Sequence, residues 1–286
     1  MKALFKVIKE GVYASYQDLG RTGYRKFGMP VAGAMDKFAF QIGNKIMNNS
    51  PDSLTLEIFL GGISLEVLDT HKIVICGADL EAALDGKPIT LWKSFSVFKG
   101  QVLTFKGPRG GSIAYIIPVG GFCADTVMNS KSAYPRADIG GLLKPGMILF
   151  VPDIPYSKVQ TGLIPSFIPN YEKEVTVNVW KSPHLSLFKQ KSIETFLDST
   201  YIYKAGDRMG YYIEGAELEF VTNGDILSEA TQFGTIQVSN NGQPVILMAD
   251  AQTVGGYATI GKIAEEDLWK VSQLKIGGKI RFQWII

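Results

Sequence analysis

Polar residues that could do chemistry gather near the end of the chain, directly after a strongly apolar run. Asp250, Gln252, Thr253 and Tyr257 surround the pair Gly255-Gly256. Carboxylate, amide and hydroxyl groups on one loop can bind a small polar molecule, and glycines allow a ligand to approach the backbone closely. The stretch therefore indicates a binding loop that follows a buried strand.

Charged and amide residues that precede this loop complete the group. They are Asp207-Arg208, Ser228-Glu229 and Thr235-Ile236-Gln237. An arginine can hold a carboxylate through two parallel hydrogen bonds, while amides and backbone N–H groups suit carbonyl oxygens. The group as a whole indicates a site for a small molecule with carboxylate and amide groups. A structural alternative stays open for each residue, because an arginine–aspartate pair can simply tie two loops together and a buried glutamate can bond to backbone N–H groups.

A second polar stretch, Gln17–Asp36, is rich in glycine and carries Asp18, Arg21 and Asp36. Its glycines free the backbone for positive φ or for close approach by a ligand. Such a density of turn residues fits either a tight structural corner or a binding loop. A fragment of the stretch recurs later in the chain, and this recurrence favours the binding loop.

The charge balance and the sparse histidines argue against several function classes. A net charge of +2, with 20% charged residues, gives no basic excess for nucleic acid or for an anionic membrane surface. His71 and His184 each stand without a second histidine nearby, so the sequence gives little support to a histidine metal site or to a Ser-His-Asp triad. No GxxxxGK(S/T) motif occurs, which argues against a P-loop nucleotide site.

Targeting, membrane and disulfide signals are also missing from the sequence. The amino terminus lacks the apolar run and the small-residue cleavage site of a signal peptide, and no window approaches the roughly 20 apolar residues that span a bilayer. Two cysteines, Cys76 and Cys123, cannot make a disulfide framework. We therefore expect a soluble, cytoplasmic protein that does not associate with membranes.

The apolar pattern predicts many short strands and few helices to position these groups. Evenly spaced β-rich runs separated by glycine turns are typical of barrels or sandwiches, and Asp85-Gly86 is a hairpin signal because both turn residues favour positive φ. Apolar residues four apart between Asp36 and Met47 predict an amphipathic helix with Asp36 near its start as a cap. Predicted strands cover residues 3–8, 12–16, 54–59, 64–68, 73–76, 80–84, 96–98, 102–106, 113–119, 176–180, 201–203, 235–238, 245–248 and 279–285, and further helices are predicted at 193–197 and 265–272.

Five landmarks recur in the same order in the two halves of the chain. The pairs are Arg21 with Arg208, Glu57 with Glu229, Asp79 with Asp250, Trp92 with Trp269, and Gly100 with Gly277. Two copies are too few for a solenoid, so each copy should close on itself. We predict a mainly β chain with two tandem β-barrels, at residues 1–119 (with an inserted helix) and 175–286. An irregular segment, 120–174, is expected to pack across both halves, and a cleft between the copies would be the natural site.

Longer motifs in both halves match a known family. They are Gln17-Asp18-x-Gly20-Arg21-x-Gly23, Gly28-x-Pro30, Gly33-Ala34-Met35-Asp36, Leu56-Glu57, Gly77-Ala78-Asp79, Asp207-Arg208-Met209-Gly210-Tyr211, Leu227-Ser228-Glu229, Gly234-Thr235-Ile236-Gln237-Val238 and Ala249-Asp250-x-Gln252-Thr253-x-Gly255-Gly256-Tyr257. This set resembles the allophanate hydrolase subunit 2-like proteins. That family includes the C-type subunit of 5-oxoprolinase, also described as the KipI antagonist KipA, and is similar to part of the carboxyltransferase region of urea carboxylase.

The resemblance implies tandem cyclophilin-like β-barrels that work within a complex. The C-type subunit pairs with a KipI-like B-type partner, and together with an A-type partner they open 5-oxoproline to glutamate at the expense of ATP. One role open to the pair of B- and C-type proteins is activation of the lactam carbonyl by phosphorylation before hydrolysis. The complex is expected to bind ATP, with no metal and no biotin attached to this chain, which lacks a Met-Lys-Met motif.

The predicted site residues divide by role. Arg208 is expected to bind the substrate carboxylate or a phosphate, while Glu229 and Asp250 polarise the substrate or transfer protons. These three are the predicted catalytic residues. The predicted substrate-binding residues are Asp18, Arg21, Asp36, Gln237, Gln252, Thr253 and Tyr257.

Two other functions remain open from the sequence. A regulatory binding protein would sequester a KipI-like kinase inhibitor without any catalytic duty. A carboxyltransferase-type module would act on a urea-like amide, with biotin carried by another chain.

Overall fold

The computed structural model describes residues 1–155 and 159–285, and the chain falls into two compact units. The first unit comprises Met1–Arg21 and Ala32–Tyr171, and the second comprises Thr22–Val31 together with the chain from Glu172 onward. Most of the predicted segment 120–174 thus groups with the first unit, except that residues 156–158 lie outside the described residues, as does residue 286 at the end of the second predicted barrel. The barrel boundaries stay a prediction.

Antiparallel strands build the first unit. One sheet has the order β11 (Ile148–Val151), β1 (Lys2–Lys9), β4 (Ser64–Val67), β9 (Val102–Phe105), β6 (Ala82–Leu84) and β7 (Lys87–Pro88). Another has the order β2 (Tyr13–Gln17), β3 (Thr55–Phe59), β10 (Gly110–Pro118), β5 (His71–Asp79) and β8 (Phe95–Val97). Strands β5 and β10 are buried along nearly their whole length, because both of their faces are covered.

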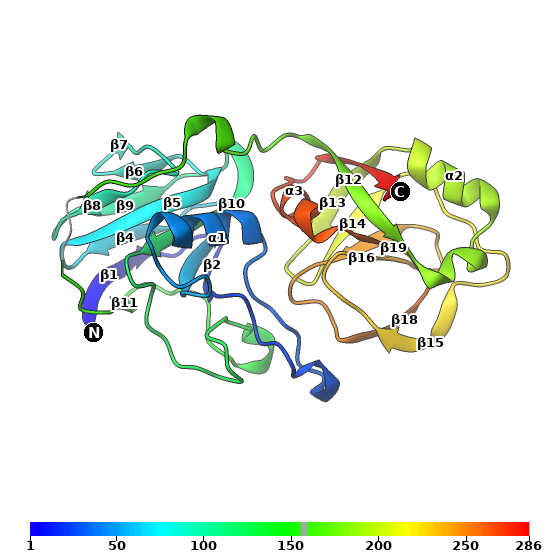
Figure 1. Cartoon of the computed structure of the whole chain (residues 1–286), viewed down its shortest axis with the longest axis horizontal. Coiled ribbons are helices and arrows are strands. Elements are labelled where there is room, and N and C mark those ends of the chain that lie inside the picture. Colours follow the sequence, from blue (N-terminus) through cyan, green and yellow to red (C-terminus); the bar gives the residue numbers. More distant parts are fainter. Residues whose placement is uncertain (156–158, 286) are drawn as a thin grey trace. The chain divides into compact units, whose positions relative to one another are not determined.

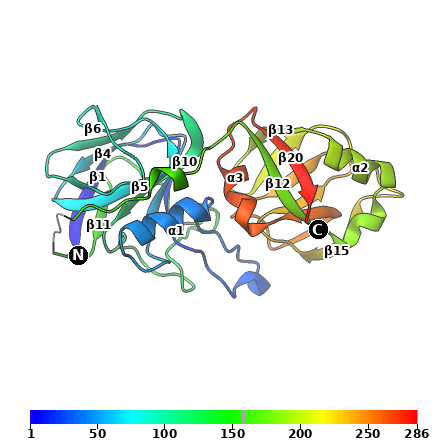
Figure 2. The same cartoon turned by 45° about the horizontal axis from the view of Figure 1, so that its top comes forward.

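Helix α1 (Lys37–Ile46) confirms the helix predicted from Asp36 to Met47. The side chain of Asp36 accepts a hydrogen bond from the backbone N–H of Ala39 at 2.8 Å, which is the geometry of a helix N-cap. The helix packs against β5 and β10 (Figure 2). Gly43 permits this close approach, since a Cβ there would lie 2.0 Å from Cδ1 of Ile117 on β10.

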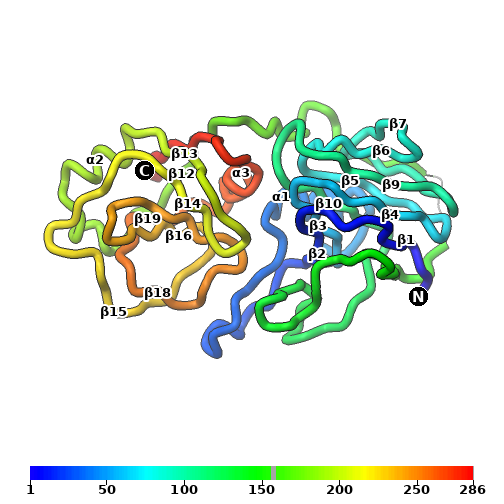
Figure 3. Tube along the Cα trace, turned by 180° about the vertical axis from the view of Figure 1, so that it is seen from behind, coloured from blue at the N-terminus to red at the C-terminus, as the bar shows by residue number. Residues whose placement is uncertain are grey.

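A closed barrel forms the body of the second unit. Its strands follow the order β12 (Glu174–Lys181), β19 (Thr259–Ile263), β16 (Thr235–Val238), β17 (Pro244–Leu247), β14 (Gly210–Glu214), β13 (Tyr201–Gly206) and β20 (Lys279–Trp284). Strands β12 and β20 run parallel, and their pairing closes the barrel. A separate ribbon of β15 (Asp225–Ala230) and β18 (Val254–Tyr257) lies beside β16 and β19 (Figures 1 and 3).

Short helices and 3-10 turns complete the two units. Helix α2 (Gln190–Asp198) includes the predicted helix 193–197, and it packs on β20 with the ring of Phe196 stacked 4.4 Å from that of Phe282. The predicted helix 265–272 divides into a 3-10 turn, η5 (Glu265–Asp267), and α3 (Leu268–Ser272). The remaining 3-10 turns are η1 (Arg25–Phe27), η2 (Pro135–Ala137), η3 (Pro165–Phe167) and η4 (Pro183–Leu187).

The predicted fold class is confirmed: the chain is mainly β, with a closed barrel in its second unit. The hairpin signal Asp85-Gly86 is confirmed as well, because these residues connect β6 and β7 with φ of 50° and 75°. Strands β7, β11, β14, β15, β18 and β19 are additions that the apolar pattern did not indicate. Within the described ranges, no helix has both the length and the apolar character needed to cross a membrane.

Replacing the cap of α1 tests whether Asp36 serves the fold. Asp36→Ala should lower the free energy of unfolding by about 0.5–2 kcal/mol, because the N–H of Ala39 loses its partner. Asp36→Asn should retain most of the stability, since asparagine caps as well as aspartate. Urea unfolding of both variants measures the difference, and equal destabilisation by the two substitutions would contradict the capping role.

Candidate functional site

A pocket of about 290 Å³ lies in the second unit, where the β15–β18 ribbon faces β12, η4, β16 and β19. We call it the ribbon pocket. Three predicted site residues line it, namely Glu229, Gln237 and Tyr257. The strand order brings these residues together although they come from β15, β16 and β18. A pocket of this size suits a compact molecule.

A chain of polar side chains runs along one wall of the ribbon pocket. Nε2 of His184 lies 3.3 Å from the carboxylate of Glu229, and its Nδ1 lies 3.0 Å from the hydroxyl of Thr259. The Thr259 hydroxyl lies 2.6 Å from that of Ser182, which in turn accepts the backbone N–H of His184 at 3.0 Å. His184 is largely buried, whereas 61% of the Glu229 side chain is exposed. The wall therefore links an accessible carboxylate to an imidazole whose other nitrogen contacts the Thr259 hydroxyl, and the Ser182 hydroxyl joins Thr259 to the backbone of His184.

The backbone fixes the tautomer of His184. The N–H of Thr259 donates to Nδ1 at 3.3 Å, and a backbone N–H can only donate. Nδ1 is consequently an acceptor, and the proton of the neutral ring sits on Nε2, where it faces Glu229. In this geometry His184 orients Glu229. In a Ser-His-Asp triad the order is reversed, because a buried carboxylate there orients the histidine.

Gln237 presents an amide to the pocket from strand β16. Its Oε1 accepts a hydrogen bond from Nε2 of Gln252 at 3.2 Å, and the residue is only 5% exposed. Within the part of the chain that the structure describes, Nε2 of Gln237 has no hydrogen-bond partner. A buried donor in this state costs about 1–3 kcal/mol.

The loop before β18 holds two further predicted substrate-binding residues, Gln252 and Thr253. Thr253 is buried, and its backbone carbonyl accepts the N–H of Thr231 at 3.0 Å and Nη2 of Arg25 at 3.1 Å. The backbone carbonyl of Gln252 accepts the Thr231 hydroxyl. These bonds fix the backbone of the loop and leave the Gln252 side chain to support Gln237.

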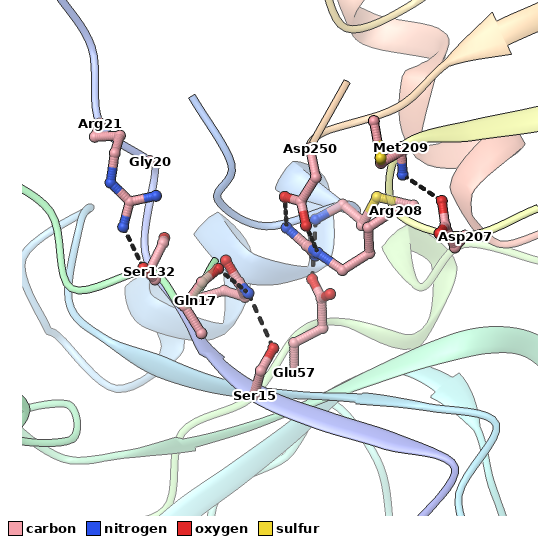
Figure 4. Close-up of polar contacts among 12 residues, drawn as sticks. Ser15, Gln17, Gly20, Arg21, Glu57, Ser132, Asp207, Arg208, Met209 and Asp250 are labelled. Atoms are coloured by element: carbon pink, nitrogen blue, oxygen red, sulfur yellow. Dashed lines mark hydrogen bonds and ion pairs between the residues drawn. The ribbon is translucent and has the colours of Figure 1, made fainter. Parts of the chain in front are cut away.

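Arg208 and Asp250 form a buried, two-pronged ion pair (Figure 4). Nε and Nη2 of Arg208 donate to the two carboxylate oxygens of Asp250 at 2.9 and 2.8 Å, and the N–H of Asp250 donates to the carbonyl of Arg208 at 2.7 Å. Both residues are less than 10% exposed. Among the described residues, neither Arg208 nor Asp250 lines the ribbon pocket. The structure thus joins two predicted catalytic residues to each other.

Asp18 and Arg21 lie in the first unit, where both contact the segment around Ser132. The carboxylate of Asp18 accepts bonds from the hydroxyls of Ser130 and Ser132 and from the N–H of Lys131. Arg21, fully buried, donates to the backbone carbonyl of Ser132 (Figure 4). These contacts anchor the start of the glycine-rich stretch.

Asp36 also lies in the first unit and belongs to a buried network. Besides capping α1, its carboxylate accepts the hydroxyl of Tyr171 at 3.1 Å, and its N–H donates to the hydroxyl of Tyr115 at 2.9 Å. Tyr115 in turn donates to Glu57 at 2.6 Å. Burial, with the nearby charges of Glu57 and Asp36, raises the pKa of Tyr115 well above its usual value.

His184 and its hydroxyl partners are functional candidates that the sequence does not indicate. The residue has no second histidine nearby, but the fold supplies Glu229 and Thr259 from strands 45 and 75 residues further along the chain. No local motif encodes this contact. Within the described residues, no group of three or more histidine, cysteine, aspartate or glutamate side chains could hold a metal ion.

Comparison with known proteins defines the class of this chain. Residues 27–284 match the family model described as carboxyltransferase domain, subdomain A and B, and the chain belongs to this family. The C-type subunit of the 5-oxoprolinase of Haemophilus influenzae is 36% identical over 94% of this chain and 87% of its own length. The corresponding 5-oxoprolinase protein of Escherichia coli is 32% identical over 98% of this chain and 90% of its own.

The fold is shared with a much longer solved protein. The structure of the K. lactis urea amidolyase superimposes with a TM-score of 0.92 at 27% identity, and the match covers 99% of this chain but 19% of that one. The similarity to both kinds of relative is consistent with the resemblance noted in the sequence motifs.

A double-mutant cycle tests the Arg208–Asp250 pair. Arg208→Met and Asp250→Leu should each lower the free energy of unfolding by about 3–5 kcal/mol, because each leaves one buried charge without its partner. The double variant should lose clearly less than the sum of the two. Urea unfolding measures all four proteins, and additive losses would show that the pair is not coupled. Because the single variants lose stability, their loss of activity alone would say nothing about chemistry.

The tautomer of His184 can be observed directly. Nitrogen NMR of the imidazole at a pH where the ring is neutral should show the proton on Nε2, since Nδ1 accepts the N–H of Thr259. Thr259→Val removes the hydroxyl but keeps the backbone donor, and so it should leave the tautomer unchanged. A proton on Nδ1 in the wild-type chain would contradict the network.

Proposed function

We propose that this chain is the C-type subunit of an ATP-dependent 5-oxoprolinase complex, which converts 5-oxoproline to glutamate together with a KipI-like B-type partner and an A-type partner. Two relatives that match almost the whole chain are named as this subunit of 5-oxoprolinase. The observation that carries the proposal is the ribbon pocket, where the exposed carboxylate of Glu229, beside His184, offers a proton acceptor to a small molecule.

Opening a lactam requires its stable amide to be activated. In the proposed reaction the lactam oxygen takes the terminal phosphoryl group of ATP, ADP leaves, and the ring nitrogen gives up its proton. Water then adds to the activated carbon, and the C–N bond breaks as the added hydroxyl passes its proton to the nitrogen. A second water hydrolyses the resulting acyl phosphate, which gives glutamate and phosphate. We assign the proton from the ring nitrogen to the carboxylate of Glu229, which is exposed to the pocket and has a second oxygen free of the His184 bond.

The other predicted residues support this site. The Arg208–Asp250 pair holds the loop that carries Gln252 and Thr253, because the backbone N–H of Asp250 also bonds to the carbonyl of Arg208. Tyr257 lines the pocket beside Gln237. Asp18, Arg21 and Asp36 remain proposed substrate-binding residues of the first unit.

ATP binding and any biotin are assigned to the complex and not to this chain. ATP is bound by the complex, and no residue of this chain is given that role. The sequence has no biotin attachment motif, so any biotin would be carried by another chain. We place the complex in the cytoplasm, where ATP is available.

A second function is favoured by one observation. The matching family model is described as a carboxyltransferase domain, and the urea amidolyase of Saccharomyces cerevisiae is 29% identical over 95% of this chain, although over only 16% of its own length. The same pocket could then serve a urea-like amide with biotin on another chain.

Reconstitution tests the proposed function. The chain, combined with its KipI-like and A-type partners, should release glutamate from 5-oxoproline with consumption of ATP, and omission of the chain should abolish turnover. Glu229→Gln should lower kcat by about 10²–10⁴-fold, the range of general acid–base catalysis. Glu217→Gln, at an exposed glutamate of the same unit, is the matched control and should leave kcat unchanged.

Three results would contradict the proposal in different ways. A stable complex with the KipI-like partner but without turnover would favour the regulatory binding protein. Turnover of urea with a biotin carrier, but not of 5-oxoproline, would favour the carboxyltransferase-type module. Full activity of Glu229→Gln would remove the proton-transfer role.

A further inference from the structure

We propose that Lys262 binds a carboxylate of the molecule that occupies the ribbon pocket, so that the pocket selects an acidic ligand over a neutral one. The inference rests on the proposed function, because 5-oxoproline carries a carboxylate beside its ring amide. It goes further by assigning a specificity-determining residue that the sequence motifs do not include.

A ligand carboxylate in this pocket requires a cationic partner. The sequence predicts Arg208 for this role, but Nε and Nη2 of Arg208 donate to both carboxylate oxygens of Asp250 at 2.9 and 2.8 Å. Among the described residues, Arg208 is not part of the lining of the ribbon pocket. Moving an anion from water into a concave site is unfavourable unless a partner compensates its charge. A different cation, one that lines the pocket, is therefore needed there.

Lys262 on strand β19 lines the ribbon pocket. It pairs with Trp180 on β12 and with Thr235 on β16, and both of these residues line the pocket as well. Directly opposite residues of antiparallel strands project to the same face of a sheet. The three side chains therefore project together from the outer face of the barrel, where Trp180 is 56% exposed.

The ammonium group of Lys262 has donors available for a ligand. Among the described residues it forms no ion pair, and its hydrogen bond goes to Oε1 of Gln232, a neutral acceptor. An ammonium group has three N–H donors, so this bond leaves further donors to bind an anion. Lys204 on β13 is different, because its ammonium pairs with the carboxylate of Glu214 at 2.6 Å. Lys262 thus presents positive charge to the pocket that no acidic side chain of the described chain compensates.

A turn at the end of the ribbon positions this ammonium group. The backbone N–H of Gln232 donates to the Thr235 hydroxyl at 3.1 Å, and the N–H of Thr235 donates to the Gln232 carbonyl at 3.0 Å. The preceding residue, Thr231, is bonded to the backbone of Thr253. The Gln232 side chain is therefore presented to Lys262 from a fixed backbone. A lysine that is held in this way loses less conformational entropy when it binds a ligand.

The charge of a second lysine in the pocket lining is engaged elsewhere. The ammonium of Lys181 lies 5.9 Å from the centroid of the Trp284 ring, which is a cation–π contact. Among the described residues, Trp284 does not belong to the pocket lining. The charge of Lys181 is thus directed to a ring outside the pocket, and the geometry favours Lys262 as the carboxylate partner.

The charges of the pocket discriminate between the two candidate functions. Lys262 supplies a positive charge, whereas Glu229, with 61% of its side chain exposed, supplies a negative one. Because Glu229 repels an anion in the same pocket, an acidic ligand depends on Lys262 for its binding. The carboxylate of 5-oxoproline meets this requirement. A urea-like amide has no carboxylate and would gain nothing from the ammonium group.

Binding of a charged and a neutral probe to the full-length chain tests this inference. The probes are L-5-oxoproline and L-5-oxoprolinamide, which has the same ring but an uncharged carboxamide. NMR titration, followed at the indole N–H of Trp180 and assigned with Trp180→Phe, should show that L-5-oxoproline binds about tenfold more tightly or more, as expected for a hydrogen bond between charged groups. The preference should shrink as the salt concentration rises.

Two lysine variants form a matched pair. Lys262→Met keeps the length of the side chain and removes its charge, so it should weaken binding of L-5-oxoproline about tenfold or more and abolish the preference over the amide. Lys191→Met, at an exposed lysine of α2 in the same unit, makes the same change in net charge and should keep the preference. Equal losses in the two variants would assign the preference to net charge and overturn the inference.

Steady-state kinetics of the assembled complex separate this role from the chemical steps. Lys262→Met should raise KM for 5-oxoproline about tenfold or more with little change in kcat, because the carboxylate is bound alike in the ground state and in the transition state. Glu229→Gln should instead lower kcat, since it removes the proton acceptor.

The outcomes distinguish this inference from the proposed function. Preferential binding of L-5-oxoproline that depends on Lys262, in a chain whose assembled complex does not turn over 5-oxoproline, would sustain the inference and remove the proposed function. Turnover by the wild-type complex with an unchanged KM in Lys262→Met would overturn the inference alone. Equal binding of the two probes to the wild-type chain, or failure of both to bind to the chain and to the complex, would also overturn it.

Discussion

The ribbon pocket depends on the antiparallel pairing of β15 with β18. This pairing places Glu229 opposite Gly255, and a shift of β15 by one residue would send Glu229 to the other face of the ribbon. Strand β15 is mostly exposed, with Leu227 90% accessible, so its own burial contributes little to holding the register. The register is held instead at its carboxyl end, where Thr231 bonds to the backbone of Gln252 and Thr253.

Buried charge supports the loops on which this pairing relies. The Arg208–Asp250 pair closes the loop that leads into β18, and its hydrogen bonds satisfy both carboxylate oxygens. In the first unit, Asp18 and Asp36 anchor the two ends of the glycine-rich stretch through hydroxyl and backbone donors. Removing one member of such a pair leaves its partner buried and unpaired. The free energy of unfolding therefore falls more when one member is removed than when both are replaced.

The sequence predicts those parts of the fold that local physics determines. Helix α1 follows from apolar residues four apart and from the Asp36 cap, and the β6–β7 hairpin follows from Asp85-Gly86. Strand β15 has no such signal, because neither of its faces is buried enough to impose an alternating pattern. The contact of His184 with Glu229 is not local either, and composition or spacing alone cannot reveal it.

The duplicated landmarks show how two similar copies can serve different needs. Glu57 is buried on β3, and one of its carboxylate oxygens accepts both the hydroxyl of Tyr115 and the N–H of Met35. Its counterpart Glu229 is exposed and touches a histidine. A carboxylate with several buried donors is fixed in position, whereas an exposed one beside a single imidazole can accept a further hydrogen-bond donor. The second copy therefore leaves its glutamate accessible, because the same sequence landmark lies there on a ribbon beside the barrel instead of within a buried sheet.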